Sequence, residues 1–219
     1  MPHAGRFPVA AALVLLCLPC PLADAATVDF SGISSGLVSS PSGQDFTYVL
    51  GPGPTTGTLN VRLVSGDATG GITTGASPDP HGIYILQLAG ALTPALLRFT
   101  FDQPCGFLIT SNETLTAHET NTFSFASGGS PWLVLGSSDA TVDNTGTQVT
   151  FVGLNDSPPY GQYAVSAAAG SFDLLVSNAP GWPYYGSAIS LEVVEPVTPA
   201  QSISVGQLKA RYATPAPTK

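Results

Sequence analysis

The stretch RFTFDQPCGFLITSNETLTAHETNTFSF, from Arg98 to Phe125, carries the clearest structural signal in this chain. Successive side chains of a β-strand point to opposite faces, so residues of like parity share a face. Apolar residues occupy odd positions here: Phe99, Phe101, Cys105, Phe107, Ile109, Leu115, Phe123 and Phe125. Polar residues, including Arg98 and His118, hold the even positions. The alternation predicts a β-hairpin that turns at Asn112-Glu113 and buries one face.

The same stretch holds Cys105, the only cysteine after residue 25, and His118, one of two histidines there. A cysteine and a histidine can act as nucleophile and base only where both side chains lie on one face within hydrogen-bond reach. Their opposite parity predicts a buried, inert thiol with a raised pKa and a solvent-facing imidazole. We therefore expect a structural cysteine and no internal disulfide.

Short runs with the same two-residue period recur from Thr27 to Val194, and turn-forming Gly, Pro, Asn and Asp separate them. Charged residues make up 9% of the chain, well below the about 25% of an ordinary globular domain. These features predict an all-β fold, an antiparallel two-sheet β-sandwich of jelly-roll or immunoglobulin-like type, over residues 26–195. A sub-boundary near Gly128 is an alternative, but the strands before it need partners, which favours a single domain.

The two ends of the chain differ from this body. Residues 1–25 combine a basic Arg6, the apolar run Val9–Leu18 and the small-x-small pattern Ala23-Asp24-Ala25. This combination is typical of a secretory signal peptide, so we expect a secreted protein, extracellular or periplasmic. Residues 196–219 contain Thr-Pro and Ala-Pro units and predict a flexible tail.

The body is strongly acidic. Between Ala26 and Glu195, two arginines stand against 13 acidic residues, a net charge of −11. Such a surface repels phosphate, so nucleic acid is not an expected partner. Because no run of about 18 apolar residues follows the signal, we do not expect an integral membrane protein. We also expect the protein to be a monomer.

Aromatic residues between strands give the strongest functional signal. The segment from Asn178 to Gly186 is framed by Pro and Gly and holds Trp182, Tyr184 and Tyr185. Trp132 and Tyr160 can approach this segment if the neighbouring strands pair. Flat rings edged by Asn, Asp or Gln suit glycans, because pyranose faces stack on aromatic rings and polar side chains bind the hydroxyls. The alternative is that the rings plug one end of the sandwich.

A structural calcium ion is the only cofactor for which the sequence offers candidate ligands. Calcium takes about six to eight oxygen ligands from carboxylates and carbonyls. The candidate ligands are the loop aspartates Asp139, Asp143 and Asp156, but they form no dense D-x-D-x-D pattern.

Catalytic motifs are missing from the sequence. It has no Gly-x-Ser-x-Gly elbow and no His-Glu-x-x-His, and only His81 and His118 can serve as the base of a triad. We therefore predict a non-catalytic extracellular binding module whose partner is a glycan or a surface protein. The alternatives are a structural or adhesive cell-surface protein without a small-molecule site, and a secreted hydrolase in which one of these histidines meets a carboxylate and a serine.

Overall fold

The computed structural model describes residues 26–50, 55–66, 72–74, 82–87, 93–155, 161–178 and 185–194. The predicted signal peptide and the predicted tail lie outside these residues. The elements are β1 (Ala26–Thr27), α1 (Ser35–Val38), β2 (Gln44–Leu50), β3 (Thr55–Ser65), β4 (Ile72–Thr74), β5 (Ile83–Gln87), β6 (Ala95–Leu115), β7 (Glu119–Gly129), β8 (Leu133–Ser138), β9 (Ala140–Asn144), β10 (Gln148–Gly153), β11 (Gly161–Asn178) and β12 (Tyr185–Val194).

The expected all-β, antiparallel architecture is confirmed for the described part of the chain. Every strand pair is antiparallel. All twelve strands belong to a single hydrogen-bonded sheet, whose main path runs β4-β5-β12-β6-β11-β7-β10-β9. The structure therefore has one continuous sheet where the sequence suggested two separate ones.

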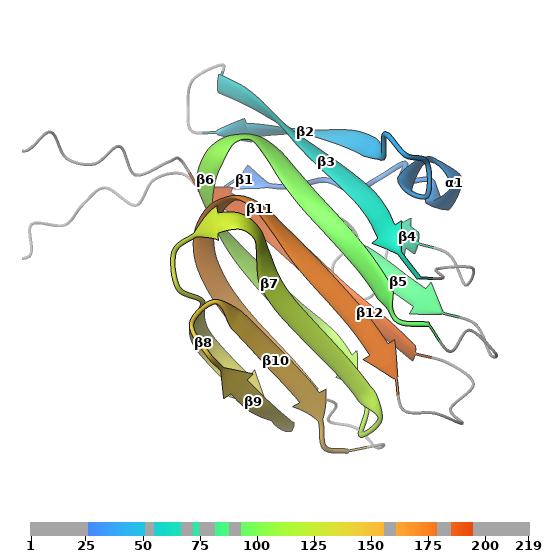
Figure 1. The fold of residues 1–219 in the computed structure, drawn as a ribbon, viewed down its shortest axis with the longest axis vertical. Helices are drawn as coiled ribbons and strands as arrows, with labels where there is room; N and C mark the ends of the chain where they lie inside the picture. The colour runs from blue at the N-terminus through green and yellow to red at the C-terminus, as the bar shows by residue number, and fades with distance from the viewer. Residues whose placement is uncertain are drawn as a thin grey trace, which may run out of the picture.

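The two longest strands give this sheet its shape. Strands β6 and β11 pair along nearly their whole length, but Ala169 faces Cys105 whereas Ser171 faces Thr100. Between these two pairs, β11 has one residue, Gly170, whereas β6 has four, Phe101 to Pro104. Such an irregularity bends a strand strongly, and Figure 1 shows β6 and β11 arching over together.

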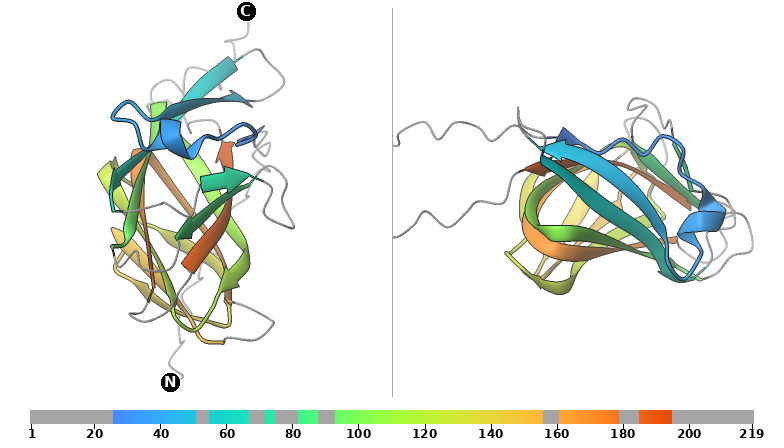
Figure 2. Two further views of the ribbon diagram at one scale, coloured as in Figure 1. Left: turned by 90° about the vertical axis from the view of Figure 1, so that its right-hand side faces the viewer. Right: turned by 90° about the horizontal axis from the view of Figure 1, so that it is seen from above.

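The bend divides the sheet into two halves. We call "first half" the strands β2, β3, β7, β10 and β9 with the part of β6 before the bend and the part of β11 after it. The "second half" holds β4, β5, β12 and β8 with the remaining parts of β6 and β11. Strands that pass from one layer to the other at a bend form the corners of packed sheets, and Figure 2 shows the layers from two further sides.

The predicted parity of β6 and β7 is confirmed. Phe99, Ile109 and Phe123 are fully buried, and Cys105 is 2% exposed. The predicted hairpin is wrong, however, because β11 lies between β6 and β7 and pairs with both. The backbone at Asn112 and Glu113 continues as strand, and the chain turns only after Leu115.

One hydrophobic core serves the whole described chain. Its buried members extend from Val28 to Val193 and come from both halves of the sheet. The strands before and after Gly128 share this core and the same sheet.

Candidate functional site

Trp132 lies in the core and not on an exposed aromatic surface. Its side chain is 2% exposed and stacks on Phe125, with ring centroids 5.0 Å apart. Its backbone N–H donates to the Gly146 carbonyl at 2.9 Å, and its carbonyl accepts from Asn144 Nδ2 at 3.1 Å. These bonds fix the chain before β8 with the indole turned inward, which corrects the expectation that Trp132 joins a glycan platform.

The other predicted aromatic residues fall largely outside the described residues. This applies to Tyr160, Trp182 and Tyr184. Tyr185 opens β12, where its backbone pairs with Gln87.

The described residues next to these aromatic segments lie at one end of the sheet. Gly161, which follows Tyr160, faces Leu115. Asn178, which ends β11, faces Glu119. Leu115 and Glu119 flank the turn that joins β6 to β7, so Gly161 and Asn178 both lie beside this turn.

Cys105 and His118 are far apart. Cys105 sits at the bend of β6, and the strand continues to Leu115 before the turn that holds His118. Ten strand residues span about 30 Å. Burial, followed by the negative charge of Asp102, raises the pKa of the Cys105 thiol to about 12. The expected burial of the thiol is confirmed, and these two residues form no nucleophile–base pair. His81, the other candidate base, lies outside the described residues.

Two of the three predicted calcium ligands, Asp139 and Asp143, lie among the described residues, in the β8–β9 turn and on β9. Asp139 adopts a positive φ of 51° in the tight turn from β8 to β9, a conformation that Asp tolerates better than most residues. Its Oδ1 accepts from Asn155 Nδ2 at 3.3 Å. Asp143 lies on β9 opposite Thr150, and Asp156 is outside the described residues. The described part of the chain contains no group of three or more His, Cys, Asp or Glu that could hold a metal ion.

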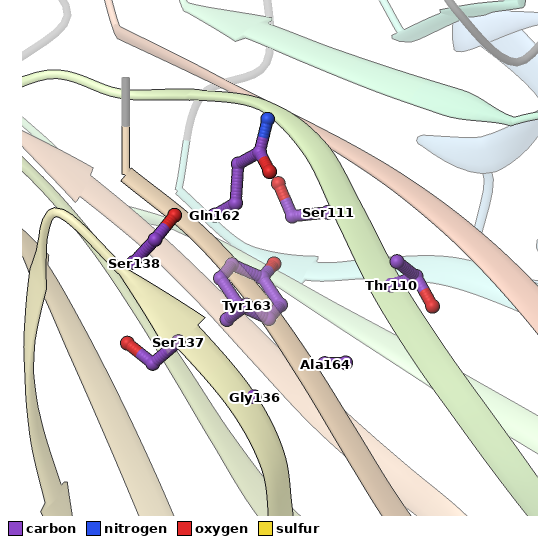
Figure 3. A pocket seen from close by; sticks show the side chains of 8 residues that line it. All are labelled: Thr110, Ser111, Gly136, Ser137, Ser138, Gln162, Tyr163 and Ala164. Carbon is purple, nitrogen blue, oxygen red and sulfur yellow. The ribbon is translucent and has the colours of Figure 1, made fainter. Parts of the chain in front are cut away.

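A hollow of about 260 Å³ opens where β6, β11 and β8 run side by side. Figure 3 shows its lining, which consists of Thr110, Ser111, Gly136, Ser137, Ser138, Gln162, Tyr163 and Ala164. Gln162 pairs with Ser138, and Ala164 pairs with Gly136 on one side and Thr110 on the other. Ala164 has a small side chain and Gly136 has none, so the space above them stays open. Hydroxyl and amide groups surround this space.

The alternation of β11 places this hollow on the outer side of the second half. Tyr163 and Val165 are buried at 2% and 0% exposure, so Gln162 and Ala164 face away from the core. Beneath the hollow, the Tyr163 hydroxyl accepts from Asn121 Nδ2 at 3.0 Å. The Tyr163 ring stacks on Phe151 with centroids 4.4 Å apart. These contacts fix the position of Tyr163 at the base of the hollow.

The chemistry of the hollow is polar and uncharged. Thr110, Ser137, Ser138 and Gln162 carry side chains that can both donate and accept hydrogen bonds, whereas Ser111 and Tyr163 are buried at its base. No charged side chain lines it, although the body around it carries −11. Sequence reasoning missed these residues, because they come from three strands whose register is set by tertiary pairing. Serine and threonine are common on every strand face of this chain, so they give no local signal.

A second hollow lies at the bend of the sheet. It measures about 320 Å³ and is lined by Pro104, Cys105, Gly106, Gly128, Ala168, Ala169 and Gly170. Small apolar residues and a protonated thiol give it no side chain that could orient a polar ligand.

No protein-family model, no curated protein and no solved structure matches this chain.

Within the described ranges, no helix has the length and apolar character needed to cross a membrane.

Proposed function

We propose that this protein is a secreted β-sandwich binding module, non-catalytic, that recognises neutral glycans at an extracellular or periplasmic surface. The signal-like residues 1–25 support secretion, and residues 196–219 would form a tail behind the binding body. The proposal concerns the body between them.

The uncharged polar lining of the hollow carries this proposal. A sugar presents hydroxyls that both donate and accept, and hydroxyl and amide side chains match both functions. An uncharged lining suits an uncharged ligand, because a buried charge needs a partner that this hollow does not offer. The volume of about 260 Å³ is below the roughly 300–1,000 Å³ that hold drug-sized ligands, so it suits a single sugar ring.

The aromatic residues complete the proposed site. Tyr160 precedes Gln162 by two residues, and Gln162 lines the hollow. We propose that Tyr160, Trp182, Tyr184 and Tyr185 supply the flat faces for sugar stacking and that the hollow supplies hydrogen bonds. Trp132 is left out of this site because its ring is enclosed by the core.

Glycan-array binding followed by titration calorimetry tests the proposal. We expect Gln162→Ala and Trp182→Ala each to weaken binding of a neutral glycan about tenfold, since one lost hydrogen bond or stacking contact is worth about 1–2 kcal/mol. Thr47→Ala is the matched control, because Thr47 is exposed on β2 in the first half. If the wild type binds no neutral glycan, or if all three variants bind like the wild type, the proposal is wrong.

A further inference from the structure

We propose that the preferred ligand is a neutral sugar that carries a small apolar substituent, a deoxy methyl or an acetyl group, which packs against Leu133 and Leu135 beside the hollow. This inference rests on the proposed glycan binding and names the class of sugar.

Two exposed leucines lie directly next to the hollow. Leu133 and Leu135 of β8 are 59% and 60% exposed. Leu135 is followed in the chain by Gly136, which lines the hollow. They are the most exposed of the large apolar side chains described.

The register of β8 places Leu133 on the same face as the hollow. Leu133 pairs with Ser166 of β11. The neighbours of Ser166 in the strand, Val165 and Ala167, are buried, so Ser166 and its partner face outward. Gln162 and Ala164 face outward for the same reason. Leu135 lies at the register shift and has no partner on β11, but its side chain is 60% exposed directly before Gly136 of the hollow. The polar hollow and the two leucines thus border on each other without a charged side chain between them.

Single exposed leucines are common and need no explanation. Two of them within three residues, beside a polar hollow and without a charged side chain between them, present an apolar surface to whatever occupies the hollow. Burying one methyl group there should tighten binding about fourfold. A sugar with both hydroxyls and a methyl or acetyl group satisfies both parts of the surface, whereas an anionic sugar meets the repulsion of the acidic body.

Two other occupants are less compatible with the described structure. A second copy of the chain, paired along β8, would bring two bodies of net charge −11 together. It would also have to pair along a strand whose register with β11 shifts between Ala164 and Val165, and such bulges oppose edge-to-edge pairing. A membrane with anionic lipids would be repelled by the same charge.

Calorimetry with matched sugar pairs tests the inference. The pairs are a 6-deoxyhexose with its parent hexose and an N-acetylhexosamine with its parent hexose. We expect wild type to bind the substituted member of at least one pair about fourfold or more tightly. Leu135→Ser should reduce this ratio to about one while the affinity for the parent hexose is unchanged. Val49→Ser is the matched control, because Val49 is 55% exposed on β2, away from the hollow, and it should keep the ratio of the wild type.

The outcomes separate this inference from the proposed function. Equal binding of both members of each pair, or a preference that survives Leu135→Ser, overturns the substituent preference and leaves glycan binding intact. Failure to bind any neutral sugar overturns both. Sedimentation at matched concentrations provides the remaining outcome: a wild-type dimer that Leu135→Ser converts to monomer would show that a second copy covers the leucines, contrary to the proposal.

Discussion

At the scale of single residues, Gly57 shows how closely β2 and β3 are fitted together. Gly57 pairs with Tyr48, and a Cβ atom at Gly57 would overlap the Tyr48 ring. The ring cannot move aside easily, because its hydroxyl donates to Asp102 Oδ1 at 3.0 Å and Asp102 Oδ2 accepts from the Thr58 N–H at 3.0 Å. We expect Gly57→Ala to lower the free energy of unfolding by about 2 kcal/mol, the typical cost of overpacking.

Urea unfolding followed by circular dichroism measures this loss. Gly36→Ala is the matched control, because a Cβ atom at Gly36 meets only Ser34 Oγ at an ordinary contact distance of 3.9 Å. Gly36 also lies in α1, where alanine is favoured over glycine by about 1 kcal/mol. Equal midpoints for the two variants would contradict the expected clash.

The buried Cys105 predicts a loss of stability at alkaline pH. Burial raises the pKa of its thiol from 9.0 to about 12, so the unfolded chain releases this proton at a lower pH than the folded one. The contribution of the Cys105 thiol to the free energy of unfolding is therefore complete below pH 9. It declines as the pH rises toward 12, by at most about 1.4 kcal/mol per pH unit. Burial likewise raises the pKa of Tyr48, which steepens the same alkaline decline.

Denaturant unfolding between pH 8 and about 11.5 checks this dependence. In Cys105→Ala the free energy of unfolding should fall less steeply with rising pH than in the wild type. The part of the decline that comes from Tyr48 should remain. Parallel curves for the two proteins would show that the thiol titrates normally in the folded state.

The residue scale also marks what local pattern can and cannot predict. The parity rule placed Cys105 correctly, because alternation along one strand is a local property. The parity rule did not place Trp132, because this residue precedes β8 and lies outside any strand. Its backbone is held by hydrogen bonds to Asn144 and Gly146, which follow it by more than ten positions.

At the scale of elements, the sequence predicted a turn at Asn112-Glu113, whereas the structure continues through these residues in β6, one strand of 21 residues. β6 also contains Pro104 and Gly106, two residue types that are uncommon inside strands. Pro104 is tolerated because it lies at the bend, where β6 has extra residues and an irregular ladder accommodates proline. Gly106 fits its place since a Cβ atom there would meet Val194. β6 pairs with β11 and β12 before and after Asn112, although the register of both ladders shifts at this point. This pairing outweighs the local turn signal at Asn112, and both partners lie more than 45 residues further along the chain.

An ion pair joins β6 to β11 on the outer side of the first half. Arg98 Nε and Nη2 donate to the two carboxylate oxygens of Asp173 at 2.8 and 3.0 Å. Arg98 is about one-third exposed and Asp173 is largely buried, so the bidentate geometry is only partly screened by water. We expect a coupling energy of about 1 kcal/mol between Arg98→Ala and Asp173→Ala.

A double-mutant cycle measures this coupling by urea unfolding at low and high salt. Added salt should reduce the coupling, because screening weakens a partly exposed pair. Arg62 faces Arg98 on β3 and is not bonded to Asp173 in the described contacts, so Arg62→Ala serves as the control partner. A coupling of zero for the Arg98–Asp173 cycle would mean that the pair adds nothing to the β6–β11 contact.

At the scale of the whole molecule, the all-β class followed from the sequence, because the two-residue period and the frequent turn residues recur along the chain. The single folded sheet did not follow, because it depends on β6 and β11 each joining both layers. The hollow was equally beyond prediction: its residues lie near positions 110, 137 and 163 and meet only once three strands are in register.

The sharing of β6 and β11 between the two layers has a mechanical consequence. A sandwich of two independent sheets can slide or peel apart at the plane between them. Here β6 and β11 run from one layer into the other and pair with each other on both sides of the bend. Separating the layers must therefore also break hydrogen bonds between these two strands. The layers should therefore melt together in one cooperative step, with no half-folded form in which one layer outlives the other.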